Sequence, residues 1–468
     1  MTSTPSAREI PFADPLAAMA AFADDPWVAF LDSAAPAPRQ ARYSFIAADP
    51  FLTMTAKDGR LTLGDQSFSG DPFLVLREVL QRHAMDRLAD GPPFQGGAVG
   101  YFAYELGHHL ERLPRPNRDD MQFPDMAIGF YDTVLAFDMI ARRAWIVSTG
   151  LPEPAGPARQ TRAIERSASL ARRLESVRGL PRLPRLARPV AWRSNFTRPA
   201  YERMVARIIE YIRAGDIFQA NFTQRFLADM PAGHTPFDLY RRLRAVNPAP
   251  FAAFLACGDT HLASASPERF LRLADGQVET RPIKGTRPRG ASPAADAAEA
   301  SALLTSEKDR AENVMIVDLL RNDLSRVCQP GSVTTPEICT LESFATVHHL
   351  VSTVQGALAA DSDAVDLLRA TFPGGSITGA PKIRAMEIIA ELEPVARGPY
   401  CGSIGYVGFD GSLDTSITIR TMAIRDGRVA VQAGGGIVAD SDPAAEYAES
   451  LAKARALLDC LSPVRAAS

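Results

Sequence analysis

The 468-residue sequence predicts a fold that mixes helices with antiparallel strands. Turn signals break residues 1 to about 150 into short β-like runs. Apolar residues recur at helical spacing from Tyr201 to Ala214. Turns at Asp410-Gly411 and Asp426-Gly427 predict a three-stranded antiparallel meander over residues 402–436.

Within the first region, Tyr43 to Ala56 is predicted to be one strand, followed by the hairpin turn Asp58-Gly59. Met126 to Asp138 is a further strand candidate. Asp71 is expected to cap a helix that has Pro72 in its first turn. Acids, histidines and cysteines do not cluster at catalytic spacing in this region, so a structural sandwich is the favoured interpretation.

Composition is ordinary for a soluble globular enzyme, with 46% hydrophobic and 22% charged residues. The net charge of -3 gives no electrostatic reason to expect nucleic acid or an anionic membrane as partner. Five scattered cysteines without a CxxC pair indicate reduced residues, not a disulfide framework or a zinc site. With no signal-like N-terminus and no long apolar stretch, we expect a cytoplasmic protein.

Three regions are predicted along the chain. Residues 1–150 form the β-rich region, and residues 198–468 form the catalytic region. Between them, residues 151–197 contain an exposed helix at 160–177 and a basic, proline-bearing connector at 180–185.

Lys284 is the first candidate catalytic residue. It follows the predicted strand Gln277 to Thr280 and lies between a rigid Pro-Ile pair and Gly285. A lysine in such a turn is commonly solvated. The alternative is an amine nucleophile, which needs partial desolvation or a neighbouring base to become neutral near pH 7.

Acidic residues stand near the starts of two predicted helices. Asp309 and Glu312 share a face of a helix that begins at Ser306, where Asp309 is expected to complete a capping box. Glu446, Glu449 and Lys453 share a face of the last helix. Acids in a first turn are usually partners of the helix dipole, but both pairs together offer the hard oxygens that Mg²⁺ prefers.

Two features of the predicted meander favour an anionic ligand. Arg420 is expected on the middle strand, opposite an apolar row, where it needs an anion or a structural carboxylate. Gly434, Gly435 and Gly436 allow close backbone approach and offer N–H donors, although alone they indicate only a loop.

These residues lie in segments that together resemble the chorismate-utilising enzymes. The segments cover nearly all of residues 201–458, and the most specific are GDIFQANFTQRF, ASPERF, TRPIKGTRPRG, EKDRAENVMIVDLLRND, VHHLVSTV, PGGSITGAPKIRAMEIIAELEP, CGSIGYVGF, DTSITIRT, AGGGIVADS and AEYAES. Looser matches in the first region include FLDS, GGAVGYFAYELG and PDMAIGFYDTVLAFD. The resemblance implies an α+β fold, with layered antiparallel sheets forming a sandwich-like core and helices packed outside.

The resemblance also implies a reaction, the amination of chorismate at ring carbon 4 to give 4-amino-4-deoxychorismate, a precursor of 4-aminobenzoate and folate. Lys284 would add to carbon 2 and displace the 4-hydroxyl, after which ammonia would attack carbon 4 and expel the lysine. Glu268 would accept the lysine proton, and His349 would protonate the departing hydroxyl. His348 is expected to be structural.

A metal site and a substrate site follow from the same resemblance. Glu312 and Glu446 would bind Mg²⁺, with Glu449 acting directly or through water, and the metal would hold the ring carboxylate. The implied substrate-binding residues are Gln219, Ser376, Tyr400, Arg420, Gly434, Gly435, Gly436 and Lys453.

Two positions separate this chain from relatives that make other products. Anthranilate synthases have alanine where this chain has Lys284, and isochorismate and salicylate synthases have lysine where it has Gln219. The combination of Gln219 and Lys284 therefore favours amination at carbon 4. The alternatives are an anthranilate synthase first component and a non-catalytic subunit that binds chorismate or tryptophan.

A glutaminase motif is not found, so the resemblance implies a heterodimer with a glutamine amidotransferase subunit that supplies ammonia. Relatives also hold tryptophan in the N-terminal sandwich. The matching positions in this chain are Ser33, Arg42, Tyr43, Pro250, Phe251 and Ala252.

Overall fold

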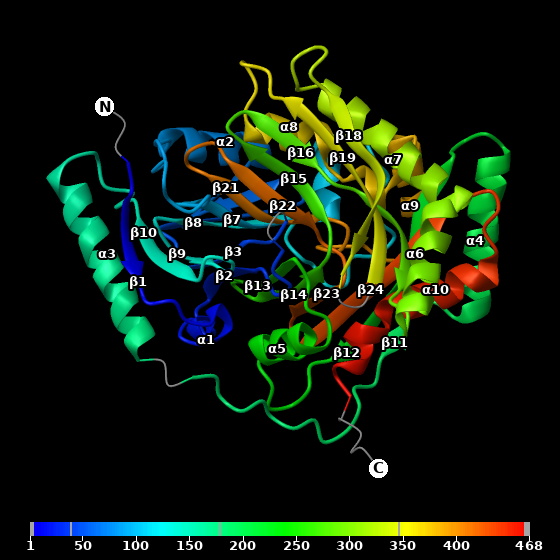
Figure 1. The fold of residues 1–468 in the computed structure, drawn as a ribbon, viewed down its shortest axis with the longest axis horizontal. Coiled ribbons are helices and arrows are strands. Elements are labelled where there is room, and N and C mark those ends of the chain that lie inside the picture. Colours follow the sequence, from blue (N-terminus) through cyan, green and yellow to red (C-terminus); the bar gives the residue numbers. More distant parts are fainter. Residues whose placement is uncertain (1–3, 38–39, 177–178, 345–346, 463–468) are drawn as a thin grey trace.

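Two large antiparallel sheets form the centre of the protein, as a computed structural model shows (Figure 1). The structure describes residues 4–37, 40–176, 179–344 and 347–462. The sheets lie face to face, and helices cover their outer faces, which gives four layers. This arrangement confirms the predicted α+β class.

The first sheet contains 12 strands in the described part of the chain. Their order is β1 (Ser6–Ile10), β10 (Arg143–Ser148), β9 (Thr133–Asp138), β3 (Tyr43–Ala48), β2 (Trp27–Asp32), β13 (Phe251–Cys257), β14 (Thr260–Ser266), β23 (Thr421–Arg425), β24 (Arg428–Ile437), β12 (Gln219–Asp229) and β11 (Arg193–Ser194), with β20 (Gly379–Ala380) beside β12.

The second sheet also contains 12 described strands. Their order is β17 (Ile283–Pro288), β19 (Val347–Ala357), β16 (Gln277–Thr280), β15 (Arg269–Ala274), β22 (Leu413–Ile417), β21 (Ser403–Gly408), β7 (Gly97–Phe102), β8 (Met126–Tyr131), β4 (Leu52–Lys57), β5 (Arg60–Leu63) and β6 (Gln66–Ser69), with β18 (Thr334–Ser343) beside β19. Each sheet combines strands from residues 1–150 with strands from residues 198–468, so these two regions share one core.

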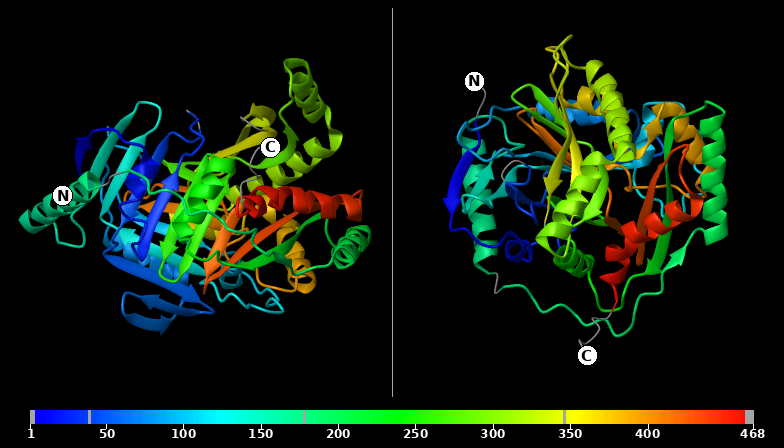
Figure 2. Two further views of the ribbon diagram at one scale, coloured as in Figure 1. Left: turned by 90° about the horizontal axis from the view of Figure 1, so that it is seen from below. Right: turned by 45° about the vertical axis from the view of Figure 1, so that its right-hand side comes forward.

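Helices occupy the outer layers and both ends of the sandwich. They are α1 (Pro15–Met19), α2 (Pro72–Arg82), α3 (Pro157–Glu175), α4 (Arg198–Arg213), α5 (Pro236–Val246), α6 (Pro293–Thr305), α7 (Glu307–Ser325), α8 (Ala364–Thr371), α9 (Lys382–Leu392) and α10 (Pro443–Asp459), with short 3-10 helices η1 (Tyr104–His109) and η2 (Gly375–Ile377). Figures 1 and 2 place α3 at one end of the molecule and α4 with α10 near the other. Within the described residues, no helix is both long and apolar enough to cross a bilayer.

Buried apolar side chains hold the two sheets and the outer helices together as layers. Alternate side chains of the two sheets, such as Phe45, Tyr101 and Leu255, fill the space between them. On one outer face α2, α7 and α8 cover the second sheet, and on the other α1, α5 and α10 cover the first. All five cysteines are buried and free.

Local signals predicted several helix starts correctly. The Asp71 carboxylate accepts hydrogen bonds from the first turn of α2, and Asp442 caps α10 in the same way. Ser306 Oγ accepts a hydrogen bond from Asp309 N at the start of α7. The reciprocal half of the predicted capping box is wrong, because the Asp309 carboxylate binds Arg287 instead, at 3.1 Å. The predicted helix at 160–177 is α3, and Val177 lies outside the described residues.

The predicted strands at 43–56 and 126–138, and the middle strand of the predicted meander, each consist of two shorter strands. In each case the two shorter strands belong to different sheets. The chain passes from the first sheet to the second after β3 at Asp49, and back again at Asp132 between β8 and β9. The predicted meander contains four strands, and the chain changes sheet between β22 and β23. Arg420 lies in this connection with φ +53°, so its expected place on a central strand is wrong. Apolar alternation is the same in both sheets, so it cannot reveal these crossings.

Candidate active site

A cavity of about 600 Å³ brings together most of the predicted functional residues. Its walls come from β12, β17, β19, β24, α7, α10 and the loops near η2 and residue 420. The predicted residues that line it are Glu268, Lys284, Glu312, His349, Ser376, Tyr400, Arg420, Gly434, Gly436, Glu446, Glu449 and Lys453. Residues up to 185 positions apart in the sequence therefore share one pocket, from Glu268 to Lys453.

A β-bulge places Lys284 in the cavity wall. Where β17 pairs with β19, Lys284 lies opposite Leu350 and Thr286 lies opposite His349, so Gly285 is the extra residue. Gly285 has φ +80°, and a Cβ there would lie 2.9 Å from a Leu303 side-chain atom. Glycine meets both conditions, and the five consecutive residues 283–287 of β17 line the cavity.

The Lys284 amine is partly buried and donates a hydrogen bond to the Ser376 carbonyl at 3.1 Å. Burial lowers its pKa below the ordinary value, and the nearby positive charge of Lys453 lowers it further. The carboxylates of Glu312 and Glu268 oppose this shift, but burial prevails. The environment therefore favours the neutral amine that a nucleophile requires.

Glu268 is 5% exposed and follows β14 in the same wall. Burial raises its pKa to about 7, although Ser376 and the charge of Lys284 act in the opposite direction. A carboxyl group with this pKa can exchange a proton near neutral pH, which is the property expected of a general base.

His349 is 7% exposed, and its Nδ1 lies 2.9 Å from Thr286 Oγ1. Burial lowers its pKa to about 4, so the imidazole is neutral at pH 7 in the protein alone. Its neighbour His348 lies between Ser343 and Asp296, at 2.8 and 3.0 Å, and points away from the cavity. These contacts agree with the expected structural role of His348.

Three carboxylates face the same cavity from α7 and α10. Burial raises the pKa of both Glu312 and Glu446, and the negative charge of Glu449 raises both further. An ideal Cβ on Gly435 would lie 3.0 Å from Glu446 Oε2 and 3.5 Å from Glu449 Oε1, so these two carboxylates are neighbours. Glu449 also pairs with Lys453 at 2.7 Å.

The carboxylates offer hard oxygen donors of the kind Mg²⁺ takes. In the described part of the chain, no group of three or more His, Cys, Asp or Glu residues is close enough to hold a metal by itself. Magnesium needs only one or two protein carboxylates when substrate and water fill its other positions. Glu312 and Glu446 each feel the negative charge of Glu449 and line the same cavity, so these carboxylates are the residues that could hold the predicted metal.

Arg420 lines the cavity and carries a positive charge that no carboxylate of the described residues neutralises. Its guanidinium donates to the Lys453 carbonyl, and no carboxylate of the described residues lies within ion-pair distance of it. Gly434 and Gly436 continue the same wall: β12 pairs with β24 through all three glycines, whereas β23 pairs with β24 only as far as Val431. The other edge of the glycine segment is therefore free of strand pairing.

Two predicted substrate-binding residues do not line the cavity. Gln219 is fully buried behind the wall, and neither polar atom of its side chain has a hydrogen-bond partner. An added Cβ on Gly436 would lie 2.0 Å from Gln219 Nε2, so the amide is held directly against this glycine. Gly435 faces the carboxylates of Glu446 and Glu449 on α10, and because it has no side chain it does not clash with them.

The sequence interpretation missed several lining residues, among them Asn221, Thr223, Thr286, Lys308 and Gln432. Strand alternation from Gln219 could have drawn attention to Asn221 and Thr223. Strand alternation does not indicate that Thr286 faces the cavity, because its orientation depends on the bulge at Gly285.

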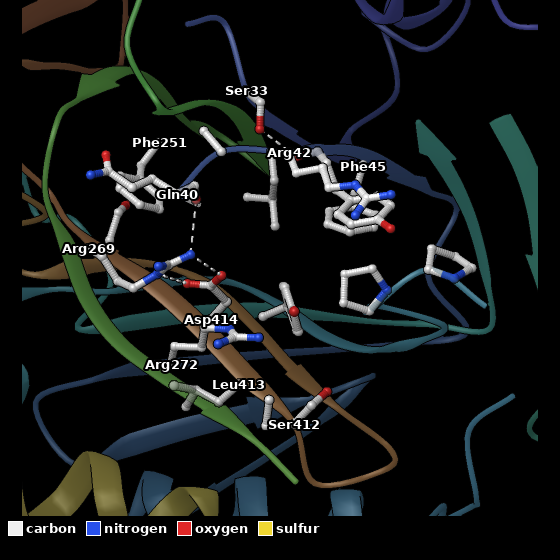
Figure 3. A pocket seen from close by; sticks show the side chains of 18 of the residues that line it. Ser33, Gln40, Arg42, Phe45, Phe251, Arg269, Arg272, Ser412, Leu413 and Asp414 are labelled. Atoms are coloured by element: carbon white, nitrogen blue, oxygen red, sulfur yellow. Dashed lines mark hydrogen bonds and ion pairs between the residues drawn. The ribbon is translucent and has the colours of Figure 1, made fainter. Parts of the chain in front are cut away.

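A second cavity of about 460 Å³ lies between the sheets and shares no lining residue with the first. Figure 3 shows the side chains that line it. All six residues of the predicted tryptophan site line it, namely Ser33, Arg42, Tyr43, Pro250, Phe251 and Ala252. Arg42 pairs with Asp138 and lies over the Tyr43 ring, 5.1 Å from its centroid. Arg269 binds Asp414 and the Gln40 carbonyl on the opposite wall.

Comparison with known proteins assigns the family. A model of the chorismate binding enzymes matches residues 29–459. The chain belongs to the chorismate binding enzyme family. This confirms the resemblance seen in the sequence.

Relatives within the chorismate binding enzymes include two kinds of first component. The chain is 43% identical over 439 residues to aminodeoxychorismate synthase component 1 of Klebsiella aerogenes, covering 92% of this chain and 93% of the relative. It is 42% identical over 455 residues to anthranilate synthase component 1 of Thermus thermophilus, covering 97% and 96%. The crystal structure of anthranilate synthase component I from Streptococcus pneumoniae is similar, with a TM-score of 0.79, 35% identity and coverage of 90% and 93%.

The environment of Lys284 predicts that its amine loses its proton at a lower pH than the amine of an ordinary lysine. Because acylating reagents react only with the neutral amine, competitive labelling of Lys284, followed by mass spectrometry across pH, should show a midpoint below 10.5. A blocked free lysine in the same tube provides the reference. A Lys284 midpoint at or above the reference would contradict the role of burial.

Proposed function

We propose that this chain is the first component of an aminodeoxychorismate synthase, which aminates chorismate at ring carbon 4. Overall identity does not separate this reaction from anthranilate synthesis, since relatives of both kinds are 42–43% identical. The observation that supports the proposal is the Lys284 amine, partly desolvated and facing a substrate-sized cavity near Glu268. An anthranilate synthase has alanine at this place, so the amine would have no function in that reaction.

The proposed reaction has two displacements. The neutral Lys284 amine forms a bond to ring carbon 2 as both ring double bonds shift and the carbon 4 hydroxyl leaves as water, protonated by His349. Glu268 takes the proton released by the lysine nitrogen. Ammonia then bonds to carbon 4, both double bonds shift back, and the bond to Lys284 breaks as Glu268 returns its proton to the lysine nitrogen. The new ammonium group at carbon 4 gives up a proton, which restores the charge of His349.

His349 can act as the acid only if it takes up a proton when substrate binds. Its pKa of about 4 in the protein alone means that the ring is neutral at pH 7. Chorismate carries two carboxylates, and negative charge placed near the ring raises the pKa of an imidazole. Proton uptake by His349 would therefore accompany substrate binding.

Residues of the opposite wall would hold the substrate. Arg420 and the free edge of the glycine segment suit carboxylate or enolpyruvyl oxygens, and Lys453 adds positive charge. Glu312 and Glu446 would hold Mg²⁺, with Glu449 beside them. The ion, when bound, would neutralise and orient the ring carboxylate.

We also infer that ammonia comes from a separate glutamine amidotransferase subunit. The designation of the relatives as component 1 supports a partner component. The product would then serve the synthesis of 4-aminobenzoate and folate.

Substitution of Lys284 tests the proposed function directly. With chorismate but no ammonia, wild-type protein should show an intact mass increase of chorismate less water, mapped to Lys284. Lys284→Ala should lose this adduct, and its residual product with ammonium should shift towards the 2-amino compound, because the truncated side chain opens space beside carbon 2. Products are identified by mass spectrometry and NMR.

Lys308→Ala is the matched control for the adduct, because Lys308 lines the same cavity and has no covalent role in the proposal. It should keep the adduct on Lys284. Wild-type protein without an adduct under quenched conditions, or Lys284→Ala with an unchanged rate of carbon 4 amination, would show that Lys284 is not the nucleophile.

Glu446 tests the metal site. Glu446→Gln keeps the shape of the side chain but removes a negative donor, so it should weaken Mg²⁺ binding by about 10-fold or more. Thermal unfolding at rising Mg²⁺ concentration should shift the wild-type midpoint upward and leave the variant nearly unmoved. Glu391→Gln, in which the altered carboxylate contacts Tyr211 on the outside of the protein, should behave as wild type. Equal Mg²⁺ responses in all three proteins would contradict the assignment.

The second cavity supports a further proposal, that tryptophan binds between the sheets. Phe251 and Tyr43 supply aromatic surface there, and Arg42 lines the same cavity while it pairs with Asp138. Isothermal titration of the protein with tryptophan should show binding at one site, and Phe251→Ala should weaken it. Phe68→Ala, at an exposed position outside this cavity, is the control. Absence of binding at millimolar tryptophan would refute the proposal.

A further inference from the structure

Arg397 forms a buried polar cluster directly behind the cavity wall. Its side chain is among the largest fully buried ones, and it does not line the cavity. Nε and Nη2 donate to the two oxygens of Glu393 at 2.9 and 2.7 Å. A buried guanidinium needs such a partner, since an unpaired charge in the interior is strongly unfavourable.

The remaining donors of Arg397 hold two separate segments of the cavity wall. Nη2 donates to the Asn221 carbonyl at 2.6 Å, and Nη1 donates to the Ile377 carbonyl at 3.2 Å. Glu393 continues the network, because its Oε1 accepts hydrogen bonds from both N and Oγ1 of Thr223 at 3.0 Å. Asn221, Thr223 and Ile377 all line the cavity.

The network ends next to the proposed nucleophile. Ile377 follows Ser376, and the Ser376 carbonyl accepts the hydrogen bond from Lys284 Nζ. A shift of the Ile377 carbonyl would therefore move the acceptor that holds the Lys284 amine. The planar guanidinium fixes this carbonyl relative to β12 through donors at set angles.

The backbone of Arg397 is fixed from the N-terminal region as well. Glu105 accepts hydrogen bonds from Arg397 N and Gly398 N, both at 2.8 Å, and Gln432 Nε2 donates to the Arg397 carbonyl at 2.7 Å. The guanidinium also lies 4.6 Å from the centroid of the Tyr104 ring. Residue 397 thus contacts η1, β12, η2 and β24 at once.

We propose that Arg397 is a positioning residue for the reaction: by binding the carbonyls of Asn221 and Ile377, it fixes the wall that aims the Lys284 amine at the substrate. This inference rests on the proposed function of Lys284. Lysine cannot replace Arg397, because one ammonium cannot bind both oxygens of Glu393 and reach two carbonyls in a fixed plane.

Steady-state kinetics of Arg397→Lys with chorismate, Mg²⁺ and ammonium test the proposal. We expect kcat to fall about 10- to 100-fold, the effect of misplacing a reacting group by an ångström or less. KM for chorismate should change little, because Arg420, Lys453 and the glycine segment are untouched. The rate of adduct formation on Lys284 should fall with kcat.

Arg225→Lys is the matched control. Arg225 lies on β12, the strand that contains Asn221, and is 4% exposed. It pairs with both oxygens of Asp120 at 2.8 Å but does not line the cavity. It should lose thermal stability while keeping kcat within about twofold of wild type. Circular dichroism identifies a temperature at which each variant is folded.

Glu393→Gln provides a second test if Arg397→Lys does not fold, because it keeps the side-chain shape and removes the charge that holds the guanidinium. Full kcat in a folded variant, or an equal loss in Arg225→Lys, would overturn the proposal. Product analysis of the wild type is independent of this outcome. A wild type that makes the 2-amino compound would refute the proposed function, while the ratio of chorismate turnover between variant and wild type would still measure the effect of Arg397.

Discussion

Desolvation of the Lys284 amine is the constraint on which the site depends. An amine that faced water would keep its proton at neutral pH, whereas partial burial lowers the pKa of Lys284. The same burial raises the pKa of Glu268 to about 7. One physical cause therefore lowers the pKa of the proposed nucleophile and raises the pKa of its proposed base, and this change favours proton transfer between them.

Charge in the cavity is balanced between two walls. Burial, helped by the negative charge of Glu449, raises the pKa of Glu312 on α7 and of Glu446 on α10, while Arg420 lacks a carboxylate partner among the described residues. The proposed Mg²⁺ and a dianionic substrate would place opposite charge against each of these two walls.

Support for this arrangement comes from the layers behind it. The bulge at Gly285 turns the Lys284 strand towards the cavity, and the Arg397 cluster ties the opposite wall to η1 of the N-terminal region. In each sheet a block of N-terminal strands pairs directly with a block of C-terminal strands, through β2 and β13 in the first sheet and through β7 and β21 in the second. The N-terminal region therefore supports the active site through shared sheets and is not an appended domain. The second cavity lies in this shared core.

The sequence by itself determined the features that depend on near neighbours or on residue type. Asp71 and Asp442 cap their helices as predicted, and the family segments indicated Lys284, Glu268 and Glu446, which all line one cavity. A cap forms within one helical turn, so its partners are already present in the local sequence. Tertiary structure alone decided which sheet each strand joins, where Arg420 lies and which residues stand behind the wall. Gln219 and Arg397 show the reason: burial and hydrogen-bond partners come from segments distant in the chain, and neither quantity is encoded in the spacing of a motif.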